Sequence, residues 1–403
     1  MEPTEIWIVS AKRTPIGKFQ GLLAEYSAPQ LGAAAIRAAL EQAQISASEV
    51  NEVYMGCVLP AGCGQAPARQ AALNGGLTQS TPCTTVNKVC GSGMKSVMLA
   101  YDAIRAGTLQ CAVAGGMESM TNAPYLLTDA RRGMRMGHKT TYDHMFLDGL
   151  QDAYEGQLMG IYAQQIADKL EFSRVEMDEW AQQSVQRSLA ADKQNMFSTE
   201  IVPMKLANGA VVDYDELPRT IDPNKIAKLK PAFSDNGSIT AANSSAISDG
   251  ASALLLMEAE QAKRHSLQPL AVIKAHTTHA RKPSEFTIAP VFAIEQLLSE
   301  LDWEVGDVNL WEINEAFAVV TQIVLKELGL DSSKVNIKGG ACALGHPIGA
   351  SGARILTTLI YSLRQLQAYG VDGDPASRKS MKGIAAICIG GGEATAIAVE
   401  VPV

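Results

Sequence analysis

The segment "SGMKSVMLAYDAI", residues 92–104, predicts a helix that packs one face against a protein core. Its apolar residues, from Met94 to Ile104, recur at helical spacing, and Gly107 ends the pattern. Strand-like runs lie before this helix, at 83–89, and after it, at 111–115. Strands that alternate with helices favour a mainly parallel sheet with helices on its faces.

A second copy of this pattern occurs in the last third of the chain. The segment "SGARILTTLIYSL" (351–363) matches the first helix, and each helix leads to an apolar run that ends in glycines, "CAVAGGMES" (111–119) and "AAICIGGGEA" (385–394). Upstream, "AAIRAALEQAQISASEVNEVYMG" (34–56) runs parallel to "FAIEQLLSELDWEVGDVNLWEI" (292–313) at almost the same offset. The constant order and spacing indicate a duplication, so we expect two similar α/β halves packed together.

The middle of the chain interrupts the repeat. Residues 128–149 are charged, Met-rich and without clear period, and two amphipathic helices are expected near 157–170 and 175–194. We therefore expect three domains: an N-terminal core half, 1–120, completed by 249–271; an inserted loop domain, 121–248; and a C-terminal core half, 272–403.

The composition excludes several classes of protein. The chain of 403 residues is 47% hydrophobic and carries a net charge of −8 with no Lys/Arg-rich run, which argues against a nucleic-acid partner. Three glycines and Glu393 interrupt the apolar C-terminal stretch, which favours two buried strands over a membrane span. No secretory signal precedes the first strand-like run, and the ending "VPV" is not a peroxisomal address, so we expect a cytoplasmic protein.

The cysteines do not suggest a disulfide framework or a metal site. There are seven of them, an odd number, and no CxxC pair occurs. Only the position of a cysteine, and the residues near it, can therefore indicate a role in chemistry.

Four polar or reactive residues follow predicted strands. Cys90 lies in "VCGSGM", His346 in "GGACALGHPIGASG", Asn314 in "NEAFA" and Cys388 in "CIGGG". Because ligands of parallel α/β sheets bind at the carboxyl ends of the strands, we expect these side chains to face one crevice. At a helix N-terminus the helix dipole lowers a thiol pKa, and a nearby imidazole would activate Cys90 further.

Taken singly, each of these residues has a structural alternative. Cys90 alone is more often a buried core cysteine, His346 a loop histidine, and Asn314 a helix cap. The glycines around Cys90 resemble a phosphate-binding loop, but the third glycine of a dinucleotide fingerprint is missing. The coincidence of all four residues at strand ends favours chemistry.

The chain resembles the thiolase family. The resemblance is carried by "NKVCGSGMKSVMLA", "GGMESM", "TAANSSAISDGASALLLM", "NEAFA", "GGACALGHPIGASGARIL" and "CIGGGEA", in the family's order from one end to the other. Within the family the sequence is most similar to acetyl-CoA acetyltransferases. The resemblance implies duplicated α/β/α halves with the loop domain inserted over the active site.

The resemblance also implies roles for the reactive residues. Cys90 matches the nucleophile that carries the acyl group as a thioester, and His346 the base that activates it. Cys388 matches the second acid/base, Asn314 the residue that holds a water for the enolate, and the N–H groups of Cys90 and Gly390 the other oxyanion hole. The implied reaction condenses two acetyl-CoA to acetoacetyl-CoA and CoA, or reverses this, with coenzyme A as substrate and product and no further cofactor or metal.

The substrate site is implied in the same way. Ser245 matches the residue that contacts pantetheine, and Leu158 stands where short-chain biosynthetic members have histidine, which predicts acceptance of longer or branched 3-ketoacyl-CoA. The other matching pocket positions are Ala241, Phe233, Met159, Ala316 and Phe317. The basic candidates for the coenzyme A phosphates are Arg219, Lys225, Lys228 and Lys230. The family further implies a homotetramer, a dimer of dimers, that acts on acyl-CoA in fatty acid metabolism.

Other functions remain open at this point. A degradative 3-ketoacyl-CoA thiolase would share the chemistry with a different pocket. Ketoacyl synthases use a cysteine with two histidines, and Asn314 and Cys388 occupy the diagnostic positions here. A dinucleotide oxidoreductase would leave both cysteines idle. A non-catalytic acyl-CoA-binding protein would be expected to have lost Cys90, His346 or Cys388, and all three are present.

Overall fold

A ten-stranded sheet forms the centre of the part of the chain that the computed structural model describes, residues 4–369 and 379–403. The strands of the first half are β1 (Ile6–Arg13), β2 (Gly17–Lys18), β3 (Glu52–Gly56), β4 (Cys83–Val86), β5 (Cys111–Ser119) and β10 (Ser248–Glu258). Those of the second half are β11 (Ala271–Ala280), β12 (Leu310–Ile313), β13 (Met381–Ile389) and β14 (Glu393–Val401).

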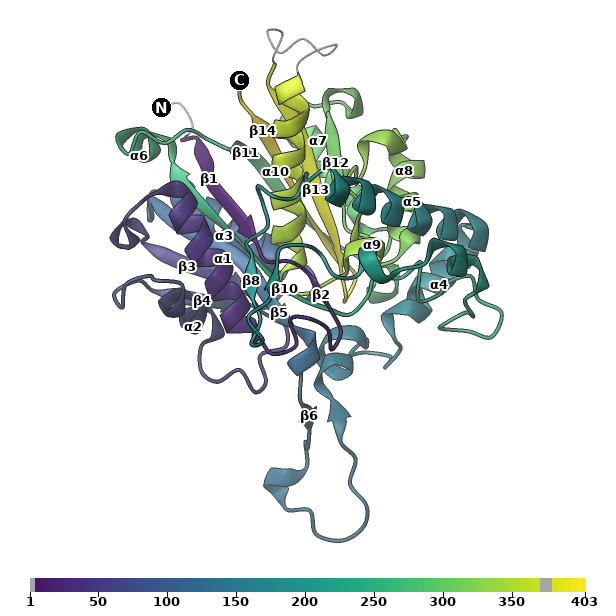
Figure 1. Ribbon diagram of the computed structural model, residues 1–403. Coiled ribbons are helices and arrows are strands. Elements are labelled where there is room, and N and C mark those ends of the chain that lie inside the picture. The colour runs from purple at the N-terminus through teal and green to yellow at the C-terminus, as the bar shows by residue number, and fades with distance from the viewer. Residues whose placement is uncertain (1–3, 370–378) are drawn as a thin grey trace.

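The strands of the two halves are arranged in mirrored order. From the middle of the sheet outward, the first half runs β1–β10–β5–β3–β4 and the second runs β11–β14–β13–β12 (Figure 1). The halves join where Ile6 of β1 pairs with Ile273 of β11. This mirrored order confirms the predicted duplication within an α/β fold.

Most neighbouring strands run antiparallel, unlike the mainly parallel sheet that the sequence predicts. Parallel pairing joins β3 to β4 and β5, and β12 to β13, whereas β10 and β14 are antiparallel to their neighbours. Residues 390–392, three glycines, connect β13 to β14, and so short a connection joins only antiparallel strands. β10 enters from the inserted segment, so no crossover helix sets its direction.

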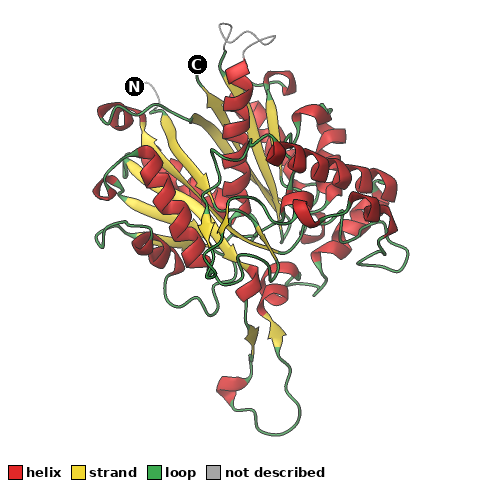
Figure 2. Cartoon of the chain, viewed as in Figure 1, coloured by secondary structure: helices red, strands yellow, loops and turns green. Residues whose placement is uncertain are grey.

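Helices cover both faces of the sheet (Figure 2). On one face α3 and α10 pack against each other and share a core with strands of both halves. On the other face α1 and α2 cover the first half, and α7 and α8 cover the second. These helices are α1 (Ala28–Ala43), α2 (Pro67–Asn74), α3 (Ser92–Arg105), α7 (Ala289–Leu301), α8 (Ala318–Leu328) and α10 (Ser351–Tyr369).

Burial on both faces explains why the central strands read as continuous apolar runs. In β5, Cys111 and Val113 pack toward α1, whereas Ala112 and Ala114 pack toward α3. All nine residues of this strand are buried, so neither face needs polar side chains.

The middle segment builds two helices and several short elements. The helices are α4 (Met159–Lys169) and α5 (Arg174–Lys193), close to their predicted positions. Ser173 starts α5 with a capping box, because its hydroxyl accepts the Glu176 N–H (3.2 Å) and the Glu176 carboxylate accepts the Ser173 N–H (2.7 Å). The short elements are β6 (Tyr125–Leu126), β7 (Tyr142–Asp143), a π-helical turn (Phe146–Leu150), β8 (Met204–Lys205) and β9 (Val211–Val212).

Residues 125–143, which we call the arm, extend away from the rest of the molecule (Figure 1). The arm is the β6–β7 hairpin and the long loop between its strands. Met136 near its tip is 92% exposed, which is unusual for a long apolar side chain unless a further surface covers it.

A buried ion-pair cluster ties the middle segment to the sheet. Arg13, at the end of β1, contacts Glu200 and Asp215, each at 2.7 Å, and all three side chains are almost fully buried. Removing one partner would leave an uncompensated buried charge, so this contact holds the two parts together. The boundaries at 120, 248 and 271 remain a prediction.

The remaining helices are short, α6 (Ala259–Arg264) and α9 (Ala341–Leu344). No helix in residues 4–369 and 379–403 is both long and apolar enough to span a membrane.

Candidate active site

Cys90 lies two residues before the start of α3, in a tight turn that follows β4. The preceding residue, Val89, has a φ of +44°, which a β-branched residue rarely adopts. The Ser92 hydroxyl donates to the Val89 carbonyl (2.6 Å) and accepts the Lys88 N–H (2.8 Å). The turn is therefore held in a strained conformation that presents the half-buried thiol at the helix N-terminus.

His346 occupies the corresponding turn of the second half, before α10. Its Nδ1 lies 2.5 Å from the Ser351 hydroxyl, which also contacts the Pro347 carbonyl at 2.9 Å. The carbonyl only accepts, so the hydroxyl proton points to it and the Ser351 oxygen accepts the Nδ1–H. His346 Nε2 is then the unprotonated nitrogen, and it has no partner in the described part of the chain. The sequence did not reveal this role of Ser351.

Two glycines bring these turns together. A side chain at Gly93 would place its Cβ 3.0 Å from the Ala353 nitrogen, and one at Gly352 would place it 2.5 Å from the Met94 nitrogen. The first turns of α3 and α10 can therefore touch only because both positions lack a Cβ. These glycines match one another in the repeat, so the duplication itself explains the close approach.

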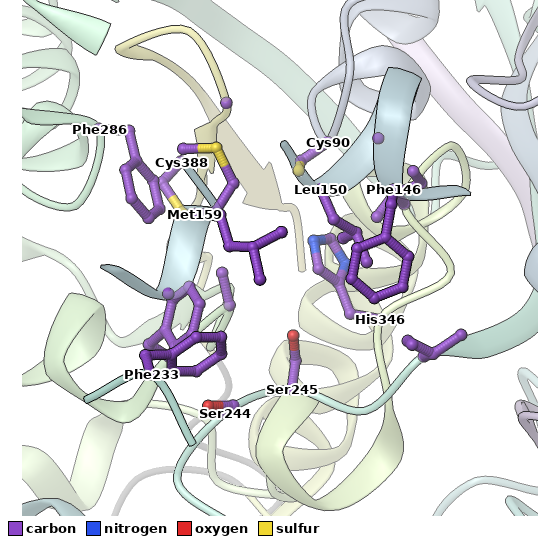
Figure 3. A pocket seen from close by; sticks show the side chains of 18 residues that line it. Cys90, Phe146, Leu150, Met159, Phe233, Ser244, Ser245, Phe286, His346 and Cys388 are labelled. Carbon is purple, nitrogen blue, oxygen red and sulfur yellow. The ribbon is translucent and has the colours of Figure 1, made fainter. Parts of the chain in front are cut away.

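Cys90, His346 and Cys388 line one cavity (Figure 3). The empty space there is about 840 Å³, part of it open to solvent. Most of the predicted site residues also line it, namely Gly390, Ser245, Phe233, Met159, Leu158, Ala316 and Phe317. In Figure 3, Cys90 and His346 lie on one side and Cys388 with Met159 and Phe286 on the other.

Two predicted residues lie outside this lining. Ala241 is exposed and lines a second depression, together with Lys225 and Ile226. Asn314 follows β12 and is 1% exposed, and neither its amide nitrogen nor its amide oxygen bonds any described residue. Burying an amide without hydrogen-bond partners costs folding free energy, which indicates that a water or ligand forms the hydrogen bonds of Asn314.

Much of the apolar wall of the cavity was not predicted from the sequence. Three aromatic rings pack edge to face, with centroids 6.0 Å apart for Phe233 and Phe317 and 6.2 Å for Phe286 and Phe317. The i, i+4 spacing of Phe146 and Leu150 is the only local pattern in the sequence that could have indicated residues of this wall. The unpredicted lining residues are Phe146, Gly149, Leu150, Gly160, Ser244, Ile247, Phe286 and Ile348.

The electrostatics of Cys90 differ from the sequence expectation. Burial raises the pKa of its thiol to about 11, although the backbone N–H groups of Gly390 and Cys90 oppose this shift. The expected lowering of the pKa is therefore outweighed by loss of water. The same two N–H groups lie beside the sulfur, where an oxyanion formed at an attached carbonyl would need donors.

The other two reactive groups are also neutral at rest. Burial, and then the positive charge of Arg354, lowers the pKa of His346 to about 3. Burial, and then the neighbouring charge of Cys90, raises the pKa of Cys388 well above its ordinary value. Near pH 7 the site therefore holds two thiols and an uncharged imidazole rather than a preformed ion pair.

Glu118, at the end of β5, positions the histidine loop. It is fully buried and accepts the N–H groups of Val58 (3.0 Å), Leu59 (3.2 Å) and Gly349 (2.9 Å). Burial raises its pKa to about 7 in spite of these bonds. Glu118 belongs to the "GGMES" segment, and only the fold shows that it holds the loop after His346.

The arrangement brings two thiols, an uncharged imidazole and two backbone N–H donors around one cavity. These are the groups that acyl transfer and proton abstraction next to a carbonyl require. No cluster of three or more His, Cys, Asp or Glu side chains in the described chain is arranged to hold a metal ion.

Comparisons with known proteins identify the family of this chain. Residues 6–260 match the family model of the thiolase N-terminal domain, and residues 267–401 match that of the C-terminal domain. Acetyl-CoA acetyltransferase 1 of Arabidopsis thaliana is 45% identical over 406 residues, 99% of this chain and 95% of the plant protein. The mitochondrial acetyl-CoA acetyltransferase B of Xenopus laevis is 48% identical over 401 residues, 98% and 92% of the two chains.

A solved structure agrees as well. The Acat5 thiolase from Ascaris suum, in complex with coenzyme A, superposes with a TM-score of 0.92 at 38% identity, and covers 98% of this chain and 100% of its own. Both halves of the chain and its full-length relatives lead to one conclusion: the chain belongs to the thiolase family.

Proposed function

We propose that this protein is an acyl-CoA C-acyltransferase that condenses two acetyl-CoA to acetoacetyl-CoA and CoA, or catalyses the reverse thiolysis. The main support for this proposal is that Cys90, His346 and Cys388 line one cavity. The N–H groups of Cys90 and Gly390 lie at the sulfur of Cys90 in the same place. Relatives named acetyl-CoA acetyltransferase support the same activity.

The first step transfers the acyl group to the enzyme. The Cys90 sulfur attacks the thioester carbonyl while His346 Nε2 takes the thiol proton, because neither group is charged beforehand. The carbonyl oxygen becomes negative beside the N–H groups of Cys90 and Gly390. The C–S bond to coenzyme A then breaks, and the imidazolium returns its proton to the departing thiolate.

The second step forms the carbon–carbon bond. Cys388 first passes its thiol proton to His346 Nε2, because both groups are neutral at rest. The Cys388 thiolate then takes a proton from the methyl group of a second acetyl-CoA, and the enolate oxygen accepts hydrogen bonds from the His346 imidazolium and from a water held on Asn314. The enolate carbon attacks the acetyl carbonyl on Cys90, the C–S bond breaks, and the Cys90 thiolate takes the proton of the imidazolium, which restores two thiols and a neutral imidazole. The two half-reactions predict ping-pong kinetics.

The cavity suits an acyl chain longer than acetyl. Leu158, Met159 and Phe233 all line it, so this part of the wall is apolar. We therefore extend the proposal to longer or branched 3-ketoacyl-CoA, as a degradative 3-ketoacyl-CoA thiolase would use in fatty acid metabolism.

Coenzyme A acts as substrate and product, with no further cofactor. Ser245 would contact pantetheine, and the depression with Ala241 and Lys225 would receive the nucleotide. Lys225 makes one ion pair, at 3.6 Å, on the surface, whereas Arg219 is held by Asp192 and stacked on Tyr214. Lys225 is thus the better phosphate candidate of the two.

We also propose a homotetramer, a dimer of dimers, in the cytoplasm. β4 ends the sheet and leaves one edge free to pair with a second copy, and the exposed arm offers a separate surface for joining dimers. The seven free cysteines fit a reducing compartment. Light scattering of the whole chain, and of a chain with residues 127–141 replaced by a short Gly/Ser linker, should give a tetramer and a dimer.

The activity is tested by the mass of the enzyme itself. Incubation with acetyl-CoA should add one acetyl group to the peptide that carries Cys90, and Cys90→Ala should remove the adduct. A wild-type protein with a demonstrably free Cys90 thiol but no adduct would contradict the proposed function, and would favour a protein that binds acyl-CoA without reaction.

A further inference from the structure

The two N–H donors at the Cys90 sulfur belong to Cys90 in the first half of the chain and to Gly390 in the second. A contact between the halves must therefore keep the two N–H groups aligned. Residues 88–91 of the first half lie against residues 389–393 of the second, and we call this contact the seam. At Gly91 a Cβ would lie 2.4 Å from Ile389 Cδ1, and at Gly390 a Cβ would lie 3.6 Å from Val89 Cγ1. The seam is therefore closely packed at Gly91, whereas at Gly390 there is room for a methyl group beside Val89.

An ion pair closes the solvent side of this seam. The Lys88 ammonium contacts the Glu393 carboxylate, and the two side chains are 22% and 35% exposed. Lys88 stands two residues before Cys90, and Glu393 stands three residues after Gly390. The mechanism described above uses neither residue.

Both partners are anchored to elements that carry the reacting groups. The Lys88 N–H donates to Ser92 Oγ in the first turn of α3, on the other side of the nucleophile. Glu393 pairs across the sheet with Ile389 of β13 and Ala280 of β11. The ion pair therefore joins the turn that carries Cys90 to the first residue of β14, directly after the glycine turn.

The strained backbone of Val89 needs a contact that holds it in place. A β-branched residue in a left-handed conformation persists only where the surroundings hold it, and Val89 lies between Lys88 and Cys90. If Lys88 were released, the turn would relax, and the Cys90 N–H would move relative to the Gly390 N–H.

We propose that Lys88 and Glu393 are positioning residues that clamp the nucleophile turn onto the glycine turn of the other half and so keep the N–H groups of Cys90 and Gly390 aimed at one oxyanion. This inference rests on the proposed acyl transfer. It assigns no contact with substrate to either residue.

The test compares this ion pair with a matched one. Lys274 and Glu400 form a pair at 3.3 Å between β11 and β14, with side chains 33% and 26% exposed, and neither residue lines the cavity. Glu393→Gln and Lys88→Met should each lower kcat of thiolysis about tenfold with little change in KM, less than the loss of a whole oxyanion donor. Glu400→Gln should leave kcat unchanged.

A charge exchange and a measurement independent of activity complete the test. The double variant Lys88→Glu with Glu393→Lys should recover most of the lost kcat, whereas either single exchange should not. Amide hydrogen exchange of the wild type and Glu393→Gln should be faster in the variant at residues 88–92 and 389–393 only. An unchanged kcat in Glu393→Gln, or equal exchange in the two proteins, would overturn the clamp.

The two proposals fail in different ways. If wild-type Cys90 acquires no acetyl group, the acyl transfer is refuted, while the hydrogen-exchange comparison still decides whether the clamp exists. If Cys90 is acetylated at the same rate in wild type and Glu393→Gln, only the clamp is refuted.

Discussion

The turns around Cys90 and His346 are equivalent in the two halves, but they hold their reactive groups differently. The Cys90 turn is half-buried and strained at Val89, whereas His346 is 6% exposed and its Nδ1 is tied to Ser351. A nucleophile must receive a bulky acyl group, while a base only has to move a proton. The duplication explains why the two turns have the same backbone arrangement. The different side chains, a cysteine in one turn and a histidine in the other, explain why their chemical properties differ.

The ends of β5 and β13 differ in the same way. Glu118 on β5 turns inward and bonds three backbone N–H groups, whereas Cys388 on β13 faces the cavity. In the proposed mechanism the first half thus contributes the nucleophile and a support for the base, and the second half contributes both proton carriers.

Removing Cys388 should separate the two half-reactions most strongly. Cys388→Ala should lower condensation and thiolysis by roughly 10³-fold, the usual scale for a positioned acid/base. Acyl exchange between acetyl-CoA and labelled coenzyme A should fall much less, because it needs only Cys90 and His346. Cys342→Ala, at another buried cysteine of the same half, is the control. Equal losses in both assays would break the assignment of Cys388 to the second step.

The pH dependence of thiol reactivity tests the state of the first turn. Because burial raises the Cys90 pKa to about 11, the thiolate fraction should rise with pH throughout the range below that value. Alkylation of Cys90 by iodoacetamide, followed by peptide mass, should therefore speed up about 100-fold between pH 7 and pH 9. A rate that levels off below pH 9 would show a thiolate already paired with imidazolium.

Ser351 tests the turn of the second half. Ser351→Ala removes the acceptor that fixes the Nδ1–H tautomer, and we expect kcat to fall about 30-fold, part of the usual worth of a base. Ser351→Thr keeps the hydroxyl and should restore most of kcat. Ser362→Ala on the same helix removes a buried hydroxyl that has no partner among the described residues, and it should leave kcat unchanged. If Ser351→Ala matched wild type in kcat, the tautomer argument would fail.

The smallest effect concerns the cavity wall that the inserted segment adds to both halves. Leu158→His places a polar ring in an apolar wall, so the preference for longer or branched chains over acetoacetyl-CoA should fall about tenfold in kcat/KM. Thiolysis rates over a series of 3-ketoacyl-CoA lengths measure this, with Leu158→Met as the apolar control. Identical profiles for wild type and Leu158→His would remove Leu158 as a determinant of chain length.

Much of the fold follows from local patterns in the chain. The apolar stripe of 92–104 and the capping residues of 173–176 specify their helices without help from distant residues, and the repeat predicts the paired halves. The direction of the strands was predicted less well. It depends on connections such as Gly390–Gly392, where a three-residue turn overrides the parallel arrangement that alternation suggests.

The candidate site divides along the same line. Cys90, His346 and Cys388 could be named from the sequence because each stands at a strand end with glycines near it. Phe286 and Ile348 could not, because they reach the cavity from elements that only packing brings together.

The sequence by itself determined which reactive groups this protein has and which secondary structure elements carry them, since both depend on residue type and short-range periodicity. Only the tertiary structure decided how those groups behave. Burial raises the Cys90 pKa instead of lowering it, Ser351 selects the tautomer of His346, and Lys88 meets Glu393 across 305 residues of chain. Desolvation and long-range contacts set these properties, and neither is written in any local stretch of sequence.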